Sequence, residues 1–367
     1  MNLEKMTKDL ICTLAMIPSP TGKEQKKAAF VRDWLTGQGA QDVKIDESGN
    51  VLWQWGRGRD HLTVFMAHMD TVFSEDTVLE VREEDGKMYC PGIGDNTANL
   101  ACMLMAARAA VRSGRDPEHP VLFAATVGEE GLGNLSGSRK VFEDYGKDTE
   151  QVVCFDLYRE AITCQAVGSV RYEVCVRTDG GHSYNDFGNA NAIAAAAELI
   201  SRLYQVKVPT EAKTTYNVGT IRGGTTVNSI AAEAVFTYEF RSLSRDCLQY
   251  MELQFRRILS GLPEDKVKVC VREIGRRPCN GMVPEDKLEE LTRRHQEILK
   301  RHTDCQVQRI PYSTDANIPL SMGIPSVNIG TISGGALHTV DEYIETDSIG
   351  SGLLIALESL KLYGETE

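Results

Sequence analysis

Residues 62–70 read Leu-Thr-Val-Phe-Met-Ala-His-Met-Asp, an apolar run that ends in two polar side chains. β-Branched and aromatic residues favour a strand over 62–67. Side chains two positions apart share one face of a strand, so His68 and Asp70 lie together at its carboxyl end. Ligand sites of open α/β sheets gather at that end, and imidazole is a good zinc ligand whose tautomer a nearby carboxylate can fix.

Size and composition favour an ordinary soluble protein. The chain has 367 residues, of which 42% are hydrophobic and 25% are charged, a length that favours two domains. No apolar run approaches the roughly 20 residues that span a bilayer, and the first residues lack the layout of a signal peptide. We therefore expect a cytoplasmic protein with no membrane partner.

Charge and cysteine usage exclude two further classes of function. The net charge of −12, with no basic stripe, argues against a nucleic-acid partner, which needs clustered Lys and Arg. The ten cysteines are dispersed and form no C-x-x-C motif, so we expect them to be reduced and assign them no catalytic role.

Strands and helices alternate along the first part of the chain. Helices are predicted over 3–16, 23–38 and 98–113, and strands over 42–45, 51–55, 62–67, 121–127 and 151–155. The last part adds helices over 285–302 and 348–363 and a strand over 326–329. This alternation predicts an α/β fold, with a mostly parallel sheet flanked by helices on both faces.

A different pattern separates these parts. Strands are predicted over 170–177, 214–221, 232–240 and 267–273, and helices over 191–203 and 243–262. The order βαββαβ is that of the α+β ferredoxin-like unit. We therefore predict a catalytic domain of residues 1–166 plus 276–367 and an inserted domain of residues 167–275.

Acidic residues follow other predicted strands of the same sheet. Glu129 and Glu130 come directly after 121–127, and Asp156 follows 151–155. Asp95 lies in the loop Pro-Gly-Ile-Gly-Asp-Asn before the helix at 98–113, and His338 lies in the late loop Gly-Gly-Ala-Leu-His-Thr. Alone, each Asp is typical of a turn or a helix N-cap, the Glu-Glu pair of a solvated surface, and the His of a turn. Converging carboxylates repel one another, however, and metal ions relieve that repulsion.

Two histidines and three carboxylates suit two metal ions better than one, because a single catalytic zinc takes about three protein ligands and a water. Paired metals need a bridging carboxylate. Neighbouring residues of an extended segment point in opposite directions, so Glu129 and Glu130 have different tasks. One of them binds metal, and the other can serve as the general base.

The series of motifs resembles the dinuclear zinc aminoacyl hydrolase family. It comprises His-x-Asp, Gly-x-Gly-Asp, Gly-Glu-Glu-Gly, a strand followed by Asp, and a late Gly-Gly-x-x-His, with Gly180-Gly181-His182-Ser183 in the inserted domain. The family includes peptidase T, the glutamate carboxypeptidases, acetylornithine deacetylase and succinyl-diaminopimelate desuccinylase. The resemblance covers nearly the whole chain, in order, and implies the zinc-exopeptidase type of sheet.

The resemblance implies two zinc ions per subunit, with Co²⁺ or Mn²⁺ as alternatives. His68 and Asp156 would bind one ion, and Glu130 and His338 the other. Asp95 would bridge the two ions, and the peptide bond after such an aspartate is typically cis in the family.

The resemblance also assigns the acid–base chemistry. Glu129 would take a proton from the attacking water and deliver it to the leaving nitrogen of an amide bond. Asp70 would be the partner of His68 behind the metal.

The inserted domain would be a lid and a dimerisation surface, which implies a homodimer. Its residues that match the family's substrate contacts are His182, Asn228 and Arg241. His182 would stabilise the oxyanion, in its own or the partner subunit, and Arg241 suits a substrate carboxylate. Turn and surface ion-pair roles remain open for His182 and Arg241.

The substrate class is left between two alternatives. Asp at position 156 is usual in the aminopeptidase and dipeptidase branches, which favours hydrolysis of a short peptide. The segment His-Met-Asp-Thr-Val-Phe at 68–73 is closer to glutamate carboxypeptidases, so a glutamate-type carboxypeptidase or an N-acyl-amino-acid deacylase is the alternative. Asp315 could contact a substrate amine or cap a helix. A binding protein without metals would show gaps in the ligand set, and none is seen.

Overall fold

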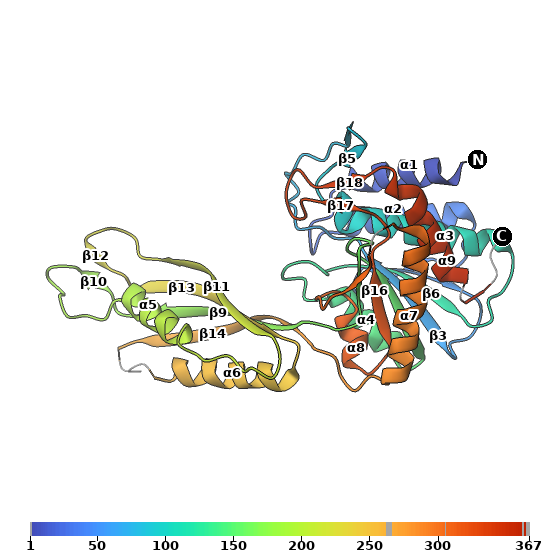
Figure 1. The fold of residues 1–367 in the computed structure, drawn as a ribbon. Helices are drawn as coiled ribbons and strands as arrows, with labels where there is room; N and C mark the ends of the chain where they lie inside the picture. The colour runs from blue at the N-terminus through green and yellow to red at the C-terminus, as the bar shows by residue number, and fades with distance from the viewer. Residues whose placement is uncertain (1, 262–265, 305, 362, 365–367) are drawn as a thin grey trace. The chain divides into compact units, whose positions relative to one another are not determined.

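The computed structural model describes residues 2–261, 266–304, 306–361 and 363–364 (Figure 1). Contacts divide them into two compact units, the first formed by the described residues up to Ala166 and from Gly281 onward, the second by Val167–Asn280. The second boundary lies five residues beyond the predicted one at 275. The last strand of the second unit causes this difference, because it continues through the polar segment and pairs Arg277 with Ser169.

The first unit is built on a mixed sheet that is parallel at its centre. Among the described residues its order is β1 (Lys44–Ile45), β2 (Val51–Trp55), β6 (Val121–Thr126), β3 (Leu62–His68), β7 (Thr149–Phe155), β16 (Ser326–Ile329), β8 (Ala161–Thr163) and β15 (Gln308–Arg309). Strands β6, β3, β7 and β16 are parallel neighbours. Every residue of β3 and β6 is buried, which confirms that their continuous apolar runs form the centre of the sheet.

Helices cover both faces of this sheet, and alternate strand residues sort to the two sides. On one side Phe65 and Phe123 join a core with α1 (Leu3–Ala15), α2 (Gln25–Gln38), α3 (Asn99–Ser113), α7 (Glu285–His302) and α9 (Ser348–Lys361). On the other side Val64 and Leu122 pack with α4 (Ser136–Tyr145) and α8 (Asn317–Ser321). The α/β class and the mostly parallel central sheet are therefore confirmed.

Smaller elements were not predicted. A second sheet of the first unit has the order β17 (Gly334–Gly335), β18 (Tyr343–Glu345), β5 (Lys87–Tyr89) and β4 (Arg82–Glu84). Its strands are too short to show a period. Helix α4 was also missed, because its first residues are Ser and Gly, which favour turns. Residue 362 of the helix predicted over 348–363 lies outside the described residues.

The second unit has the predicted βαββαβ order. Its elements are β9 (Gly168–Arg177), α5 (Ala192–Leu203), β11 (Thr214–Gly223), β13 (Glu233–Ser242), α6 (Arg245–Leu259) and β14 (Lys268–Arg277). The strands form an antiparallel sheet in the order β11-β13-β9-β14. Helix α6 ends at Leu259, before the predicted end at 262, which lies outside the described residues.

Both helices of the second unit pack on one face of its sheet. Val174 and Phe236 meet Leu199 of α5 and Phe255 of α6 there. The opposite face of β9 carries the partly exposed residues of its alternating pattern. A short ribbon of β10 (Gly181–His182) and β12 (Ser229–Ile230) completes the unit. Among the described residues of both units, no helix is long and apolar enough to cross a lipid bilayer.

Candidate metal centre

The carboxyl ends of three adjacent parallel strands carry the predicted ligands. His68 is the last residue of β3, which lies between β6 and β7 in the sheet. Glu129 and Glu130 follow β6, and Asp156 follows β7. These residues are 2% to 6% exposed, so they converge in a space that is largely closed to solvent.

Asp95 and His338 reach the same place from outside the sheet. Asp95 lies in a kinked turn, Ile93–Ala98, directly before α3, and its peptide bond to Asn96 is cis, as the resemblance implied. The Asn96 side chain donates to the main-chain oxygen of Phe155 at the end of β7, which ties the turn to the sheet. His338 follows the short strand β17 in a left-handed conformation, with φ of 61°.

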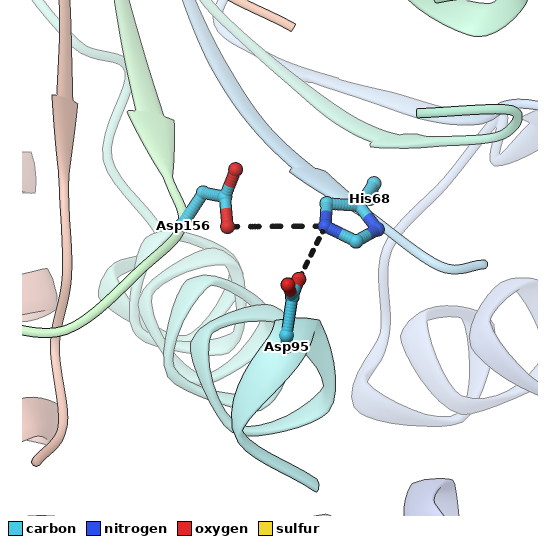
Figure 2. Close-up of side chains that lie close together, drawn as sticks. All are labelled: His68, Asp95 and Asp156. Carbon is cyan, nitrogen blue, oxygen red and sulfur yellow. Dashed lines mark hydrogen bonds and ion pairs between the residues drawn. The ribbon is translucent and has the colours of Figure 1, made fainter. Parts of the chain in front are cut away.

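Asp95 lies between the two histidines. Its Oδ1 is 3.0 Å from His68 Nε2, and its Oδ2 is 3.2 Å from His338 Nε2. Asp156 Oδ1 is 3.8 Å from the same His68 nitrogen (Figure 2). Glu130 Oε1 is 3.3 Å from His338 Nε2. The carboxylate of Asp95 therefore spans two groups of donors, the arrangement that a bridging ligand of two metals requires.

Electrostatics show how strongly these groups depend on one another. Burial alone would lower the pKa of His68, but Asp156, Asp70 and Asp95 outweigh it and raise that pKa well above its usual value. Hydrogen bonds to Asp95 and Glu130 raise the pKa of His338 to about 10. Burial raises the pKa of Glu130. Protons on the histidines thus balance the carboxylates, and a metal cation would take their place.

The donor set fits metal ions. Three overlapping groups have ligand atoms within 4.8 Å of one another: His68–Asp95–Asp156, His68–Glu129–Glu130 and Asp95–Glu130–His338. Apart from the 3.3 Å contact with His338 Nε2, no donor reaches the buried Oε1 of Glu130 within the described structure, so its compensation depends on the charge of that histidine or of a cation. Mixed imidazole and carboxylate donors suit zinc, cobalt or manganese.

Asp70 fixes both glutamates as well as His68. The Nδ1 of His68 lies 3.0 Å from the main-chain oxygen of Asp70 and 3.4 Å from its Oδ1. The Asp70 carboxylate also accepts the main-chain N–H of Glu129, at 3.0 Å, and of Glu130, at 2.9 Å. Although burial opposes ionisation, His68 and these N–H groups lower the pKa of Asp70. Its second contact, to the glutamate loop, was not predicted.

Like Asp70, Glu342 is a buried carboxylate that supports the centre, but the sequence did not reveal it. It is 0% exposed, and its two oxygens accept the main-chain N–H groups of Gly92, Gly94 and Asp95 at 3.0, 2.8 and 2.7 Å. Glu342 therefore holds the loop that presents Asp95. In sequence it is an acidic residue four positions after His338, next to Asp341, which is typical of a solvated surface.

The predicted site residues of the second unit lie in two separate locations, His182 and Asn228 at the short ribbon and Arg241 on β13. His182 pairs with Ser229 in the β10–β12 ribbon, and Ser183 donates its main-chain N–H to the main-chain oxygen of Asn228. The Nδ1 of His182 accepts the main-chain N–H groups of Tyr184 and Asn185, at 3.2 and 3.4 Å. This leaves the proton of the neutral ring on Nε2.

Arg241 is engaged by an acid of its own strand. Its Nε and one terminal nitrogen donate to the two oxygens of Glu239, at 3.0 and 3.2 Å. The ion-pair alternative for Arg241 is thus present, and its contact with a substrate carboxylate remains a prediction.

Asp315 does not cap α8, and its contact with a substrate amine remains a prediction. It is 4% exposed and accepts the Thr126 hydroxyl at the end of β6, and its Oδ1 is buried. The N-cap position of α8 belongs to Ala316. Asp315 thereby ties the segment before α8 to the end of β6.

Comparison with known proteins places these observations in a family. The model of peptidase family M20/M25/M40 matches residues 64–361. An acetylornithine deacetylase of Buchnera aphidicola is 23% identical over 317 residues, which cover 82% of this chain and 80% of the relative. The first curated relatives are matched over only 37% and 58% of their own lengths.

Two solved structures share the fold over almost the whole chain. A tripeptidase of Staphylococcus aureus has a TM-score of 0.78 and 22% identity, and covers 98% of each chain. A dinuclear metal-binding peptidase of Bacillus subtilis has a TM-score of 0.67 and 16% identity, again with 98% of each chain covered. With the family match over residues 64–361, the chain belongs to peptidase family M20/M25/M40.

Proposed function

We propose that this enzyme hydrolyses an amide bond in a short peptide, as a dipeptidase, tripeptidase or aminopeptidase, with two zinc ions held by His68, Asp95, Glu130, Asp156 and His338. The observation that carries the proposal is the place of the Asp95 carboxylate, 3.0 Å from one histidine and 3.2 Å from the other. When bound, the ions would supply Lewis acidity toward a water molecule and the substrate carbonyl.

Glu129 has the place of the general base in this proposal. It is 5% exposed, and one of its carboxylate oxygens lies within 4.8 Å of ligand atoms of His68 and Glu130. Asp70 accepts its main-chain N–H, which fixes the backbone from which the Glu129 side chain extends. Glu129 takes the proton of the attacking water and passes it to the leaving nitrogen, which avoids expulsion of an amide anion.

His182 is the proposed donor to the oxyanion. Because two main-chain N–H groups point at Nδ1, the Nε2–H is free to donate to the oxygen that becomes negative during attack. Asn228, beside it on the ribbon, and Arg241 are proposed substrate contacts. Tyr184 and Phe187 near His182 are 85% and 89% exposed, which supports the proposal that the second unit is a lid and the interface of a homodimer.

A deacylase or a glutamate-type carboxypeptidase is the second candidate. The acetylornithine deacetylase relative, matched over most of both chains, favours it. The two candidates share the metal centre and differ in what flanks the scissile bond.

The deciding experiment offers the zinc-, cobalt- or manganese-loaded enzyme matched substrates and resolves the products by mass. The panel holds dipeptides and tripeptides with a free amino terminus, the same peptides acetylated, peptides with C-terminal glutamate, and N-acetyl amino acids. We expect cleavage of the free peptides. Glu129→Gln should keep its metal and lose turnover by at least about a hundredfold.

Two controls sharpen this experiment. Glu118→Gln changes an exposed glutamate of the same unit and should cleave like the wild type. Preference for the acetylated substrates would select the second candidate. If no loaded form cleaves any substrate, or if Glu129→Gln turns over normally, the hydrolytic mechanism is wrong.

A further inference from the structure

Two cysteines of the second unit lie opposite each other on neighbouring strands. In the antiparallel register of β9 and β14, Cys175 is the partner of Cys270, and both are free thiols. Residues directly opposite in such a pair point to the same face of the sheet. Of the cysteines that the structure describes, these two are the pair that a strand register brings together.

The neighbouring register pair shows that side chains meet across these strands. Glu173 and Arg272 are opposite each other two positions away on the same face, and they form an ion pair of 3.0 Å. Opposite residues of an antiparallel pair have Cα atoms about 4.5–5.5 Å apart, and a disulfide accepts about 4.4–6.8 Å. A bond between Cys175 and Cys270 therefore requires no large movement of either strand.

The two thiols differ in access. Cys270 is exposed, whereas Cys175 is partly buried. Burial and the charge of Glu233 raise the pKa of Cys175. The helices of the unit cover the opposite face of the sheet, so this face is the one through which a small reagent reaches the pair. Cys270 is thus the first to react, and Cys175 is placed to attack it afterwards.

We propose that Cys175 and Cys270 are a dithiol site that a peroxide converts into a cross-strand disulfide. The Cys270 thiol gives up its proton and the thiolate attacks one oxygen of hydrogen peroxide. The O–O bond breaks and the departing hydroxide takes up that proton, so a sulfenic acid and one water result. The Cys175 thiol then attacks that sulfur, the S–S bond forms, and the S–O bond breaks with release of the second water. Two thiols are oxidised, and one peroxide is reduced to two waters.

The bond would join the two strands that connect this unit to the rest of the chain. The unit begins one residue before β9 and ends three residues after β14. The closed loop contains α5, β11, β13 and α6, nearly the whole unit. A long closed loop removes much conformational freedom from the unfolded chain. We therefore expect the oxidised unit to unfold at a temperature at least about 4 °C higher.

The experiment treats the full chain with hydrogen peroxide at limiting concentration and maps the peptides without reduction. We expect loss of two hydrogen atoms from the intact mass, one linked peptide containing Cys175 and Cys270, a raised unfolding temperature, and reversal by a thiol reductant. In Cys175→Ser the sulfenic acid on Cys270 should persist and react with dimedone. Cys12→Ser, which changes a partly buried cysteine of the first unit, is the matched control and should behave like the wild type.

The proposal is overturned if the folded wild type gives dimedone adducts or links at other cysteines while Cys175 and Cys270 remain unlinked. The wild-type map decides this even if a serine variant does not fold. Because the readouts are masses and unfolding temperatures, the result does not depend on the proposed catalytic activity.

Discussion

The metal centre of the first unit and the open sheet face of the second unit both carry many charged groups, but they hold them differently. At the centre, main-chain N–H groups fix buried carboxylates: Asp70 accepts from the glutamate loop, and Glu342 accepts from three residues around Asp95. On the open face, charged side chains pair with each other in water. Arg272 and Glu173 are 71% and 26% exposed, and Arg177 and Glu233 are 60% and 52% exposed.

This difference separates a site from a surface. A buried carboxylate is costly to desolvate, so it persists only where fixed donors or a cation compensate it. Main-chain N–H groups are held by the backbone and cannot rotate as side chains do. They therefore fix each buried carboxylate in one position. Exposed ion pairs cost little and stabilise little. Changes at the centre should accordingly be severe and specific, and changes on the open face should be mild.

The largest effect is expected for Asp95→Ala. Loss of the bridging carboxylate leaves His68 and His338 without their shared partner, so metal content should fall and activity should drop by at least about a thousandfold. Elemental analysis after gel filtration measures the first quantity, and steady-state kinetics the second. Asp116→Ala, on the surface of the same unit, is the control. Full metal occupancy in Asp95→Ala would refute the bridging role.

His182→Ala tests a single contribution of the second unit to the centre. The proposed metal ligands all belong to the first unit, so metal content should stay complete. Turnover should fall by about a hundredfold, because the oxyanion loses a donor. Asn185→Ala, in the same turn, serves as control. Normal turnover in His182→Ala would refute the role of this histidine at the oxyanion and favour its alternative as a turn residue.

A buried histidine of α7 sharpens the comparison through pH. Burial lowers the pKa of His295 to about 4, although its bond to the Leu291 oxygen raises it slightly, and its Nε2 has no hydrogen-bond partner in the described structure. An unfolded histidine binds a proton near pH 6.5, and the folded one does so only near 4. The contribution of His295 to the free energy of unfolding is therefore complete above about pH 6.5. It is lost as the pH falls toward 4, which lowers the free energy of unfolding by about 3 kcal/mol.

The measurement is chemical denaturation at several pH values with a chelator present. His295→Leu cannot take up a proton and should lack this part of the pH dependence. His119→Ala changes an exposed histidine and should keep it. Equal slopes in wild type and His295→Leu would show that His295 titrates normally.

Glu342→Ala should weaken metal binding without removing a ligand. Three main-chain N–H groups lose their acceptor, and the Asp95 loop gains freedom, which we expect to cost about 10- to 100-fold in metal affinity. Glu342→Gln retains one acceptor oxygen and should lose less. Competition with a chromophoric chelator gives the affinities. Wild-type affinity in both variants would mean that the loop holds its shape without Glu342.

The smallest effect is expected on the open face of the second unit. Arg272→Ala removes an exposed ion pair with Glu173, so the free energy of unfolding should change by less than about 1 kcal/mol. Metal content should not change at all. Denaturant unfolding and elemental analysis check both, and a loss above about 2 kcal/mol would contradict the comparison.

The pattern of apolar and polar residues along the chain predicted those strands and helices whose formation depends on residues close in sequence. The apolar run of β3, fully buried in the structure, predicted both the strand and the edge at which His68 lies. The alternation in β9 predicted a half-buried strand in the same way. His295, by contrast, lies in the polar segment Arg-Arg-His-Gln at 293–296 and is nevertheless fully buried, because the packing of α7 decided its environment.

The motifs at the ends of β3, β6 and β7 were sufficient by themselves to predict a metal site, since parallel strands place their carboxyl ends on one edge. What only the tertiary structure decided is how that site is held. Glu342 lies 247 residues from Asp95 in sequence, and Asp315 lies 189 residues from Thr126. The spacing of residues within one strand or helix does not predict such contacts. They form between loops that only the packing of the whole unit brings together.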